Sequence, residues 1–239
     1  MRGIDVSHHQ DPKRMDYSKI RAEGFDWLIA RAAYGSKEDE TFHVHVERAI
    51  DVDMVYGAYL FYRQTQDKAR QLDTFQEQID RVGGVQIAPV LDFEWNEKWD
   101  GKVNPARFNE DGEWILEQLV RIYGKAIVYL SPGFFQTLGC PSYLLEYPWW
   151  VSHWTQDPEP WCPFKAWSMW QYTNQGNVDG YAGDLDLNRT RDLPLLVEPE
   201  KPIANEKAEV FEAIASDLDH MAANFTLLAK LERGELEGE

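Results

Sequence analysis

Short apolar segments alternate with amphipathic helical segments along most of the chain, and this alternation constrains the fold more than any other feature. Such apolar runs, rich in β-branched and aromatic residues, are typical of strands buried on both faces. Strands are predicted at residues 3–6, 26–32, 55–62, 87–94, 126–130, 149–153, 168–172 and 184–188. Helices are predicted at residues 16–23, 40–52, 67–82 and 104–123. Repeated β/α units of this kind predict an α/β protein with a parallel sheet.

About eight strands predict a closed or nearly closed barrel, and the shorter connections late in the chain predict an irregular (β/α) TIM-like one. In such barrels the active site lies at the carboxyl ends of the strands. Asp5, Asp92 and Glu94 fall at such ends, and Asp186 falls near one. The first and last strands of a closed barrel are neighbours, so Asp5 and Asp186 should meet across that seam. Four carboxyl groups are therefore expected to line one mouth of the barrel.

The strand at residues 87–94, IAPVLDFE, ends in two carboxyl groups. Side chains of a strand alternate, so Asp92 and Glu94 share a face with Cα atoms roughly 7 Å apart, while Leu91 and Phe93 point into apolar packing. Burying two acids is costly, so the pair is either salt-bridged or serves acid/base chemistry. Crowded carboxyl groups separate one another's pKa values, as glycoside hydrolysis requires. The longer Glu94 suits a general acid, and the deeper Asp92 suits positioning of the sugar.

Aromatic residues supply candidate sugar platforms, because Trp and Tyr rings are flat and amphipathic. The chain has 10 Trp, of which several must belong to the core. The candidates for substrate binding are Tyr34, Tyr62, Trp95, Trp99, Tyr129, Trp154, Trp170 and Tyr172. Tyr34, Tyr62 and Trp170 are favoured because they lie at strand ends.

The formal net charge of −17 argues against nucleic acid and against electrostatic adhesion to an anionic surface. No apolar run is long enough to span a bilayer, and no signal peptide follows Met1. We expect either a protein made and kept in the cytosol until it is released or a mature secreted form. Cys140 and Cys162 form either a disulfide or two separate thiols.

The chain changes character after Asp192. A Pro-rich linker is predicted at residues 193–204 and an acidic amphipathic helix at 205–239, beyond a catalytic domain at 1–192. Apolar residues of that helix follow the 3-and-4 spacing of a heptad seam. They are Phe211, Ile214, Leu218, Met221, Phe225 and Leu228. This face either packs on the barrel or forms a homo-oligomer.

Four motifs in order resemble glycoside hydrolase family 25 lysozymes, the Chalaropsis-type N-acetylmuramidases common among phage endolysins. These are GIDVSHHQ at 3–10, GAYLFYR at 57–63, VLDFEWN at 90–96 and MWQYTNQGNVDGYAGDLDLN at 169–188. The resemblance covers about residues 3–190. It implies an irregular β/α barrel that cleaves the β-1,4 bond between N-acetylmuramic acid and N-acetylglucosamine in peptidoglycan, without a cofactor.

The resemblance also assigns roles to the acids. Glu94 matches the general acid, Asp92 the acid that assists through the substrate N-acetyl group, and Asp5 and Asp186 the supporting acids. The family's His-Phe pair is replaced here by Leu60-Phe61, which should alter substrate preference without removing an acid.

Two other classes of function remain as alternatives. A non-catalytic barrel that binds cell-wall glycan would keep the aromatic cleft but would not need four acids. A metal-dependent sugar deacetylase would use His8 and His9 beside Asp5. Adjacent histidines on a loop point apart, however, and no His-x-x-x-His spacing accompanies them, so no metal is expected.

Overall fold

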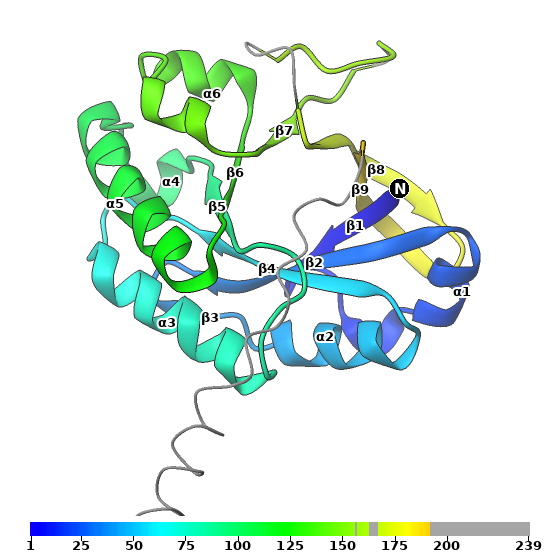
Figure 1. Cartoon of the computed structure of the whole chain (residues 1–239). Coiled ribbons are helices and arrows are strands. Elements are labelled where there is room, and N and C mark those ends of the chain that lie inside the picture. The colour runs from blue at the N-terminus through cyan, green and yellow to red at the C-terminus, as the bar shows by residue number, and fades with distance from the viewer. Residues whose placement is uncertain (156, 163–166, 192–239) are drawn as a thin grey trace, which may run out of the picture. The chain divides into compact units, whose positions relative to one another are not determined.

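The computed structural model describes residues 1–155, 157–162 and 167–191, and these form one barrel surrounded by helices (Figure 1). The strands are β1 (Arg2–Val6), β2 (Phe25–Tyr34), β3 (Lys37–Glu38), β4 (Val55–Phe61), β5 (Val90–Phe93), β6 (Ile127–Leu130), β7 (Trp149–Ser152), β8 (Met169–Val178) and β9 (Tyr181–Thr190). The α-helices are α1 (Tyr17–Ala22), α2 (Phe42–Asp51), α3 (Lys68–Arg81), α4 (Glu97–Asp100), α5 (Pro105–Tyr123) and α6 (Pro132–Thr137). Two 3₁₀ turns, Pro12–Arg14 and Ser142–Glu146, complete the list.

The barrel closes in the strand order β1-β9-β8-β7-β6-β5-β4-β2, with β1 also paired to β2 and β3 added at the edge of β2. All eight predicted strands are present, so the prediction of an irregular closed α/β barrel is confirmed. One direction differs from the prediction. β9 runs antiparallel to both β8 and β1, so the last unit is a β-hairpin and not a β/α unit.

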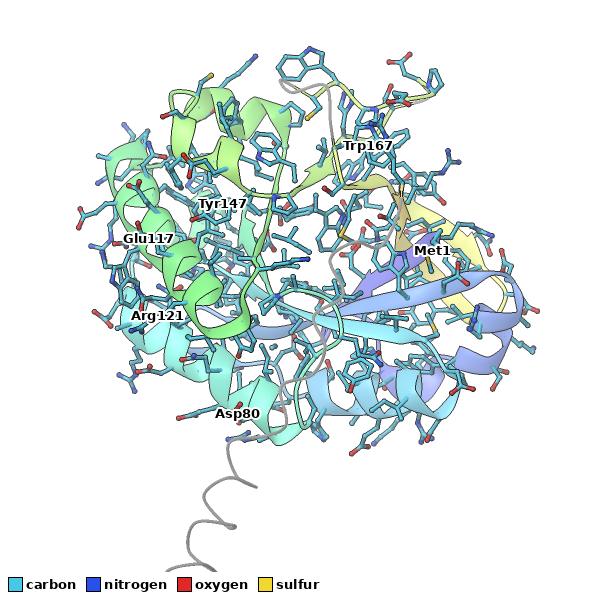
Figure 2. The ribbon with its side chains drawn as sticks, in the orientation of Figure 1. Met1, Asp80, Glu117, Arg121, Tyr147 and Trp167 are labelled. Carbon is cyan, nitrogen blue, oxygen red and sulfur yellow. The ribbon has the colours of Figure 1, made fainter. Side chains whose placement is uncertain are left out.

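The predicted helices form where local sequence favours them. α5 begins after Asn104, whose side chain accepts a hydrogen bond from the Arg107 backbone N–H, and has Pro105 in its first turn. It ends at Gly124, which adopts a left-handed conformation with φ of 76°. Figure 2 shows Glu117 and Arg121 on the outer side of this helix, where both are exposed.

Two apolar cores hold the barrel together. The outer core lies between strands and helices and includes Leu91 and Phe93, which face away from the acids as predicted. The inner core fills the barrel with Trp27, Ile29, Ile87, Ala88, Val90, Ile127, Tyr129, Trp150 and Met169. Gly3 leaves the room that the Trp27 indole occupies, because a Cβ at Gly3 would lie 2.0 Å from that ring. Side chains therefore fill the interior of the barrel, where the rings of Trp150 and Trp27 make an edge-to-face contact with their centroids 6.5 Å apart.

The predicted linker and tail helix, with the heptad seam from Phe211 to Leu228, lie outside the described residues. Cys140 is an exposed free thiol, so no disulfide joins it to Cys162. Among the described residues, no helix is both long enough and apolar enough to cross a bilayer.

Candidate active site

A hollow of about 260 Å³ opens at the mouth of the barrel, and all four predicted acids line it. We call it the acidic hollow. Its lining residues are Asp5, Ser7, His9, Gln10, Arg31, Tyr59, Phe61, Asp92, Glu94, Tyr129, Trp150, Trp154, Gln171, Asn174 and Asp186. Residues from β1, β2, β4, β5, β6, β7, β8 and β9 converge here, so the whole ring of strands contributes to one site.

Asp5 and Asp186 meet across the seam between β1 and β9, where they are direct register partners. The Asp5 carboxylate accepts hydrogen bonds from Asn188 Nδ2 at 2.6 Å and from Gln171 Nε2 at 3.1 and 3.3 Å. Burial raises the pKa of Asp5 to about 6, and these amide donors oppose that rise because they stabilise the ionised form.

Asp92 lies deeper, on the same rung of the sheet as Phe61 of β4 and Tyr129 of β6. Only 5% of the residue is exposed, and its Oδ1 atom has no hydrogen-bond partner among the described residues. Burial, together with the nearby Glu94 and Asp5 carboxyl groups, raises the pKa of Asp92 well above its usual value. A buried oxygen without a partner is costly in the free protein, so it is available for a ligand donor.

Glu94 follows the last residue of β5 and lies at the rim of the acidic hollow, where the residue as a whole is exposed. Protein atoms still crowd its carboxyl group. This desolvation, and the charge of Asp5, raise the pKa of Glu94 to about 7, while a hydrogen bond from Tyr129 lowers it. A glycan lying over the rim would exclude further water and so strengthen the retention of a proton by Glu94.

Asp186 is the fourth acid, and burial followed by the charges of Asp5 and Glu94 raises its pKa to about 8. A hydrogen bond between the two carboxyl groups lets Asp186 keep a proton while Asp5 is ionised. Like charges so close cannot all ionise together. Near neutral pH the cluster therefore contains both ionised and protonated carboxyl groups, which is the condition for acid catalysis beside a developing positive charge.

Gln171 connects the two sides of the acidic hollow. Its Nε2 donates to Asp5, while its Oε1 accepts hydrogen bonds from Tyr129 Oη at 3.0 Å and from Trp154 Nε1 at 2.9 Å. Tyr129 Oη also lies 3.5 Å from Glu94 Oε1. The Gln171 amide thus positions Asp5, Tyr129 and Trp154 relative to one another.

Arg31 is the cation of the acidic hollow, and its guanidinium is held by Asp39 through an Nε–Oδ2 hydrogen bond of 2.9 Å. It also contacts His8 Nδ1, which lies 3.6 Å from Asp39 Oδ2. His8 is thereby directed toward Arg31 and Asp39 and not toward the acid pair of β5. In the described part of the chain, no group of three or more His, Cys, Asp or Glu side chains is arranged to hold a metal ion.

Of the predicted aromatic contacts, Tyr129 and Trp154 line the acidic hollow, whereas several others do not. Tyr62 has no exposed surface and donates from Oη to Asp111 Oδ2 at 2.6 Å in the outer core, so its prediction as a sugar contact is corrected. Trp170 and Tyr172 pack against Arg189 on the outer side of β8, which corrects their prediction as well. The strand alternation that points Gln171 inward points both of these neighbours outward.

Tyr34, Trp95 and Trp99 also lie outside the residues that line the acidic hollow. The Tyr34 ring stacks on Phe61 at 4.7 Å and lies under the Arg63 guanidinium at 4.6 Å. Trp95 is 39% exposed and donates from Nε1 to the Gly101 carbonyl, and Trp99 is 59% exposed. Leu60 is buried in the outer core, so of the Leu60-Phe61 pair only Phe61 reaches the acidic hollow.

Sequence reasoning missed Gln171, Asn188 and Trp150. Trp150 forms the floor of the acidic hollow, with its Nε1 donating to Asn188 Oδ1 at 2.8 Å and its ring 4.8 Å from that of Tyr129. Alternation from Asp186 places Asn188 on the inward face, so the DLDLN segment contained the signal for that residue. The amides were overlooked because they carry no charge.

Comparison with known proteins gives consistent matches over the barrel. The family model described as Glycosyl hydrolases family 25 matches residues 4–181. The uncharacterized protein YegX of Escherichia coli is 30% identical over 192 residues, covering 78% of this chain and 68% of its own. Lysozyme M1 of Streptomyces globisporus is 26% identical over 203 residues, covering 79% and 67%.

Solved structures share the fold. The bacterial lysozyme of Streptomyces coelicolor superposes with a TM-score of 0.72 at 24% identity and covers 81% of this chain and 93% of its own. A family 25 glycosyl hydrolase of Bacillus anthracis gives a TM-score of 0.69 at 23% identity, with coverage of 80% and 89%.

Proposed function

The chain belongs to glycosyl hydrolase family 25, and from that premise we propose that it is a muramidase of bacterial cell walls. It cleaves the β-1,4 bond between N-acetylmuramic acid and N-acetylglucosamine in peptidoglycan. The single observation that supports this most strongly is the Asp92–Glu94 pair at the end of β5, within a hollow that gathers two further carboxyl groups. Lysozyme M1, a relative by sequence, bears the name of that activity.

In the first step, Glu94 gives its proton to the oxygen of the scissile bond, and the bond from that oxygen to C1 of the muramic acid breaks. A carboxyl group with its pKa near 7 is still largely protonated in weakly acidic solution and is acidic enough to donate. The leaving sugar departs with a new hydroxyl group. Positive charge grows at C1, and the ionised Asp5 stabilises it electrostatically.

Asp92 acts on the N-acetyl group of the same sugar. Its unpartnered Oδ1 accepts a hydrogen bond from the acetamide N–H, which directs the acetamide oxygen at C1. That oxygen forms a bond to C1 as the glycosidic bond breaks, giving a cyclic oxazolinium. Water then attacks C1 while the Glu94 carboxylate takes a proton from it, which reopens the ring and restores the acid. Two attacks at C1 retain its configuration.

Mass analysis of digested peptidoglycan tests this proposal. New reducing ends on N-acetylmuramic acid are expected, and full activity should persist in EDTA. Reducing ends on N-acetylglucosamine would make the protein a glucosaminidase. Release of acetate without chain cleavage would support the deacetylase, and binding without any product would support the wall-binding barrel.

The proposal extends to how the protein meets its substrate. The partner is the glycan strand of peptidoglycan, with no part for nucleic acid or membrane insertion. The protein reaches the wall by release from the cytoplasm in which it is made or by secretion. Self-association through the seam from Phe211 to Leu228 is proposed in addition. Light scattering of the full chain against a chain ending at Asp192 tests it, and an unchanged monomer mass for the full chain would refute it.

A further inference from the structure

A second hollow, of about 570 Å³, adjoins the acidic hollow on the far side of Glu94. We call it the neutral hollow. Its lining residues are Glu94, Ser131, Pro132, Gly133, Gln136, Ser152, His153, Trp154 and Trp161. Glu94 and Trp154 line both hollows, so these two residues form the boundary between them.

The two hollows differ in charge. The acidic hollow contains four carboxyl groups and Arg31, whereas Glu94 is the only Asp, Glu, Lys or Arg in the lining of the neutral hollow. The remaining polar groups of the neutral hollow are hydroxyl, amide and imidazole groups. Such a surface can bind an uncharged ligand with many hydroxyl groups, and it offers no counter-ion for a charged one.

Position relative to Glu94 gives the neutral hollow its place in the reaction. The charge that develops at C1 must lie among Asp5, Asp92 and Asp186, so the sugar that is attacked occupies the acidic hollow. The proton donor lies beside the glycosidic oxygen, between the two sugars that this oxygen joins. The leaving sugar therefore extends past Glu94, away from Asp92, and into the neutral hollow.

Two indoles make that hollow suitable for a pyranose ring. Trp154 and Trp161 are 55% and 50% exposed, which is unusual for the largest apolar side chain. The Trp154 indole is held by a hydrogen bond from its Nε1 to Gln171 at 2.9 Å. The backbone at Trp161 is held by a hydrogen bond from its N–H to His153 Nδ1 at 3.0 Å. Because Nδ1 accepts, the other ring nitrogen of His153 is left as a donor at the neutral hollow.

We infer that the neutral hollow is the leaving-group subsite, and that Trp161 binds there the uncharged N-acetylglucosamine on the reducing side of the scissile bond. This inference rests on the proposed function, and it adds the direction in which the glycan strand lies across the two hollows. The glycan runs from its non-reducing side in the acidic hollow to its reducing side over Trp161. Trp161 is then a binding residue for the leaving sugar alone.

Two substrates with the same sugar in the acidic hollow separate these roles. Soluble uncrosslinked peptidoglycan strands place a sugar in the neutral hollow, whereas the β-fluoride of the disaccharide GlcNAc-MurNAc places none there. We expect Trp161→Ala to lower kcat/KM on strands by about tenfold, as loss of one aromatic contact would do. On the fluoride its kcat/KM should stay within about twofold of the wild type, and Trp161→Phe should recover most of the activity on strands.

Leu145→Ala is the control, because Leu145 is an apolar residue of comparable exposure, 47% against 50% for Trp161, and lies outside the lining of both hollows. It should leave kcat/KM on both substrates unchanged. The inference is overturned if Trp161→Ala lowers kcat/KM on both substrates alike, if it lowers kcat/KM on neither, or if Leu145→Ala weakens the cleavage of strands to the same degree. A wild-type protein that cleaves neither substrate overturns the proposed function itself.

Discussion

The two halves of the barrel are built differently. From β1 to β6, apart from the short antiparallel β3, parallel strands alternate with helices, and this half supplies Asp5, Asp92 and Glu94 at strand ends. From β8 to β9 the chain forms an antiparallel hairpin, which supplies Asp186 and the amides of Gln171 and Asn188 from mid-strand positions. In the proposed mechanism, the regular half thus carries the acids that react with substrate, and the hairpin carries groups that set the ionisation of those acids.

Substitutions in the two halves should therefore have different effects. Those in the regular half should lower the rate of the reaction, whereas those in the hairpin should mainly change the pH dependence of activity or the stability of the fold.

The largest effect is expected from Glu94→Gln, which removes the transferable proton but retains shape. Activity on peptidoglycan strands should fall by about 10²–10⁴-fold, the usual contribution of a general acid. Turbidity clearing and release of reducing ends would both report it. Glu97→Gln, on the exposed start of α4, is the control and should leave the rate unchanged.

Asp92→Asn should have the next largest effect, since an amide can still fill the site but no longer offers two acceptor oxygens. Misdirection of the acetamide should cost about 100-fold in kcat with little change in KM. A change confined to KM would contradict the role of Asp92 in the chemical step and would leave it as a binding residue.

Gln171→Leu in the hairpin should cost less rate but alter the pH profile. Asp5 loses the Gln171 donor while keeping that of Asn188, and its pKa therefore rises above about 6. The reaction needs ionised Asp5 and protonated Glu94. The acidic limb of the plot of kcat/KM against pH should therefore move to higher pH, and the pH range of high activity should narrow. Gln175→Leu, an exposed position of the same strand, should leave the profile unchanged. If the acidic limb does not shift in Gln171→Leu, the ionisation of Asp5 does not control the rate.

The smallest effect concerns stability. Asp186 has a folded-state pKa of about 8, above the value of an exposed Asp, so the folded protein binds the extra proton. Its contribution to the free energy of unfolding is therefore fully present below about pH 4 and is lost as the pH rises toward 8. Asp186→Asn should remove this loss and raise Tm at pH 8 by about 2–4 °C, the shift for about 1 kcal/mol.

The same substitution should change Tm much less at about pH 3, where Asp186 is mostly protonated in both the folded and the unfolded state. Asp184→Asn is the control, because Asp184 is exposed two positions earlier on β9. A Tm gain for Asp186→Asn that does not depend on pH would contradict the assigned ionisation.

The sequence predicts the regular half well because its signals are physical and local. Pro105 and Gly124 bound α5, and the alternation of Leu91, Asp92, Phe93 and Glu94 sorts β5 into an apolar face and an acidic face. Strand direction in the hairpin is not encoded in this way, because the alternation of polar and apolar residues in DLDLN is the same whether the strand runs parallel or antiparallel to its neighbours.

Three aromatic predictions, Tyr62, Trp170 and Tyr172, failed for a related reason, whereas Tyr129 and Trp154 do line the acidic hollow. Position at a strand end does not say which face a side chain takes, and a shift of one residue exchanges the faces. Trp170 and Tyr172 were predicted as sugar contacts, although Gln171 between them is the residue that faces inward. Tyr62 was predicted likewise, although Phe61 is the residue that faces inward. Only the register between strands resolves this, and register is a property of the closed barrel.

In the proposed mechanism, Glu94 donates a proton to a leaving sugar at the boundary of the two hollows. The most direct measurement compares Glu94→Gln on peptidoglycan strands with the same variant on GlcNAc-MurNAc β-fluoride, whose leaving group departs without protonation. We expect kcat/KM, which reports departure of the leaving group and not the later attack of water, to fall by about 10²–10⁴-fold on strands and by at most about tenfold on the fluoride. Equal losses on the two substrates, or unimpaired cleavage of strands, would contradict the proposed mechanism.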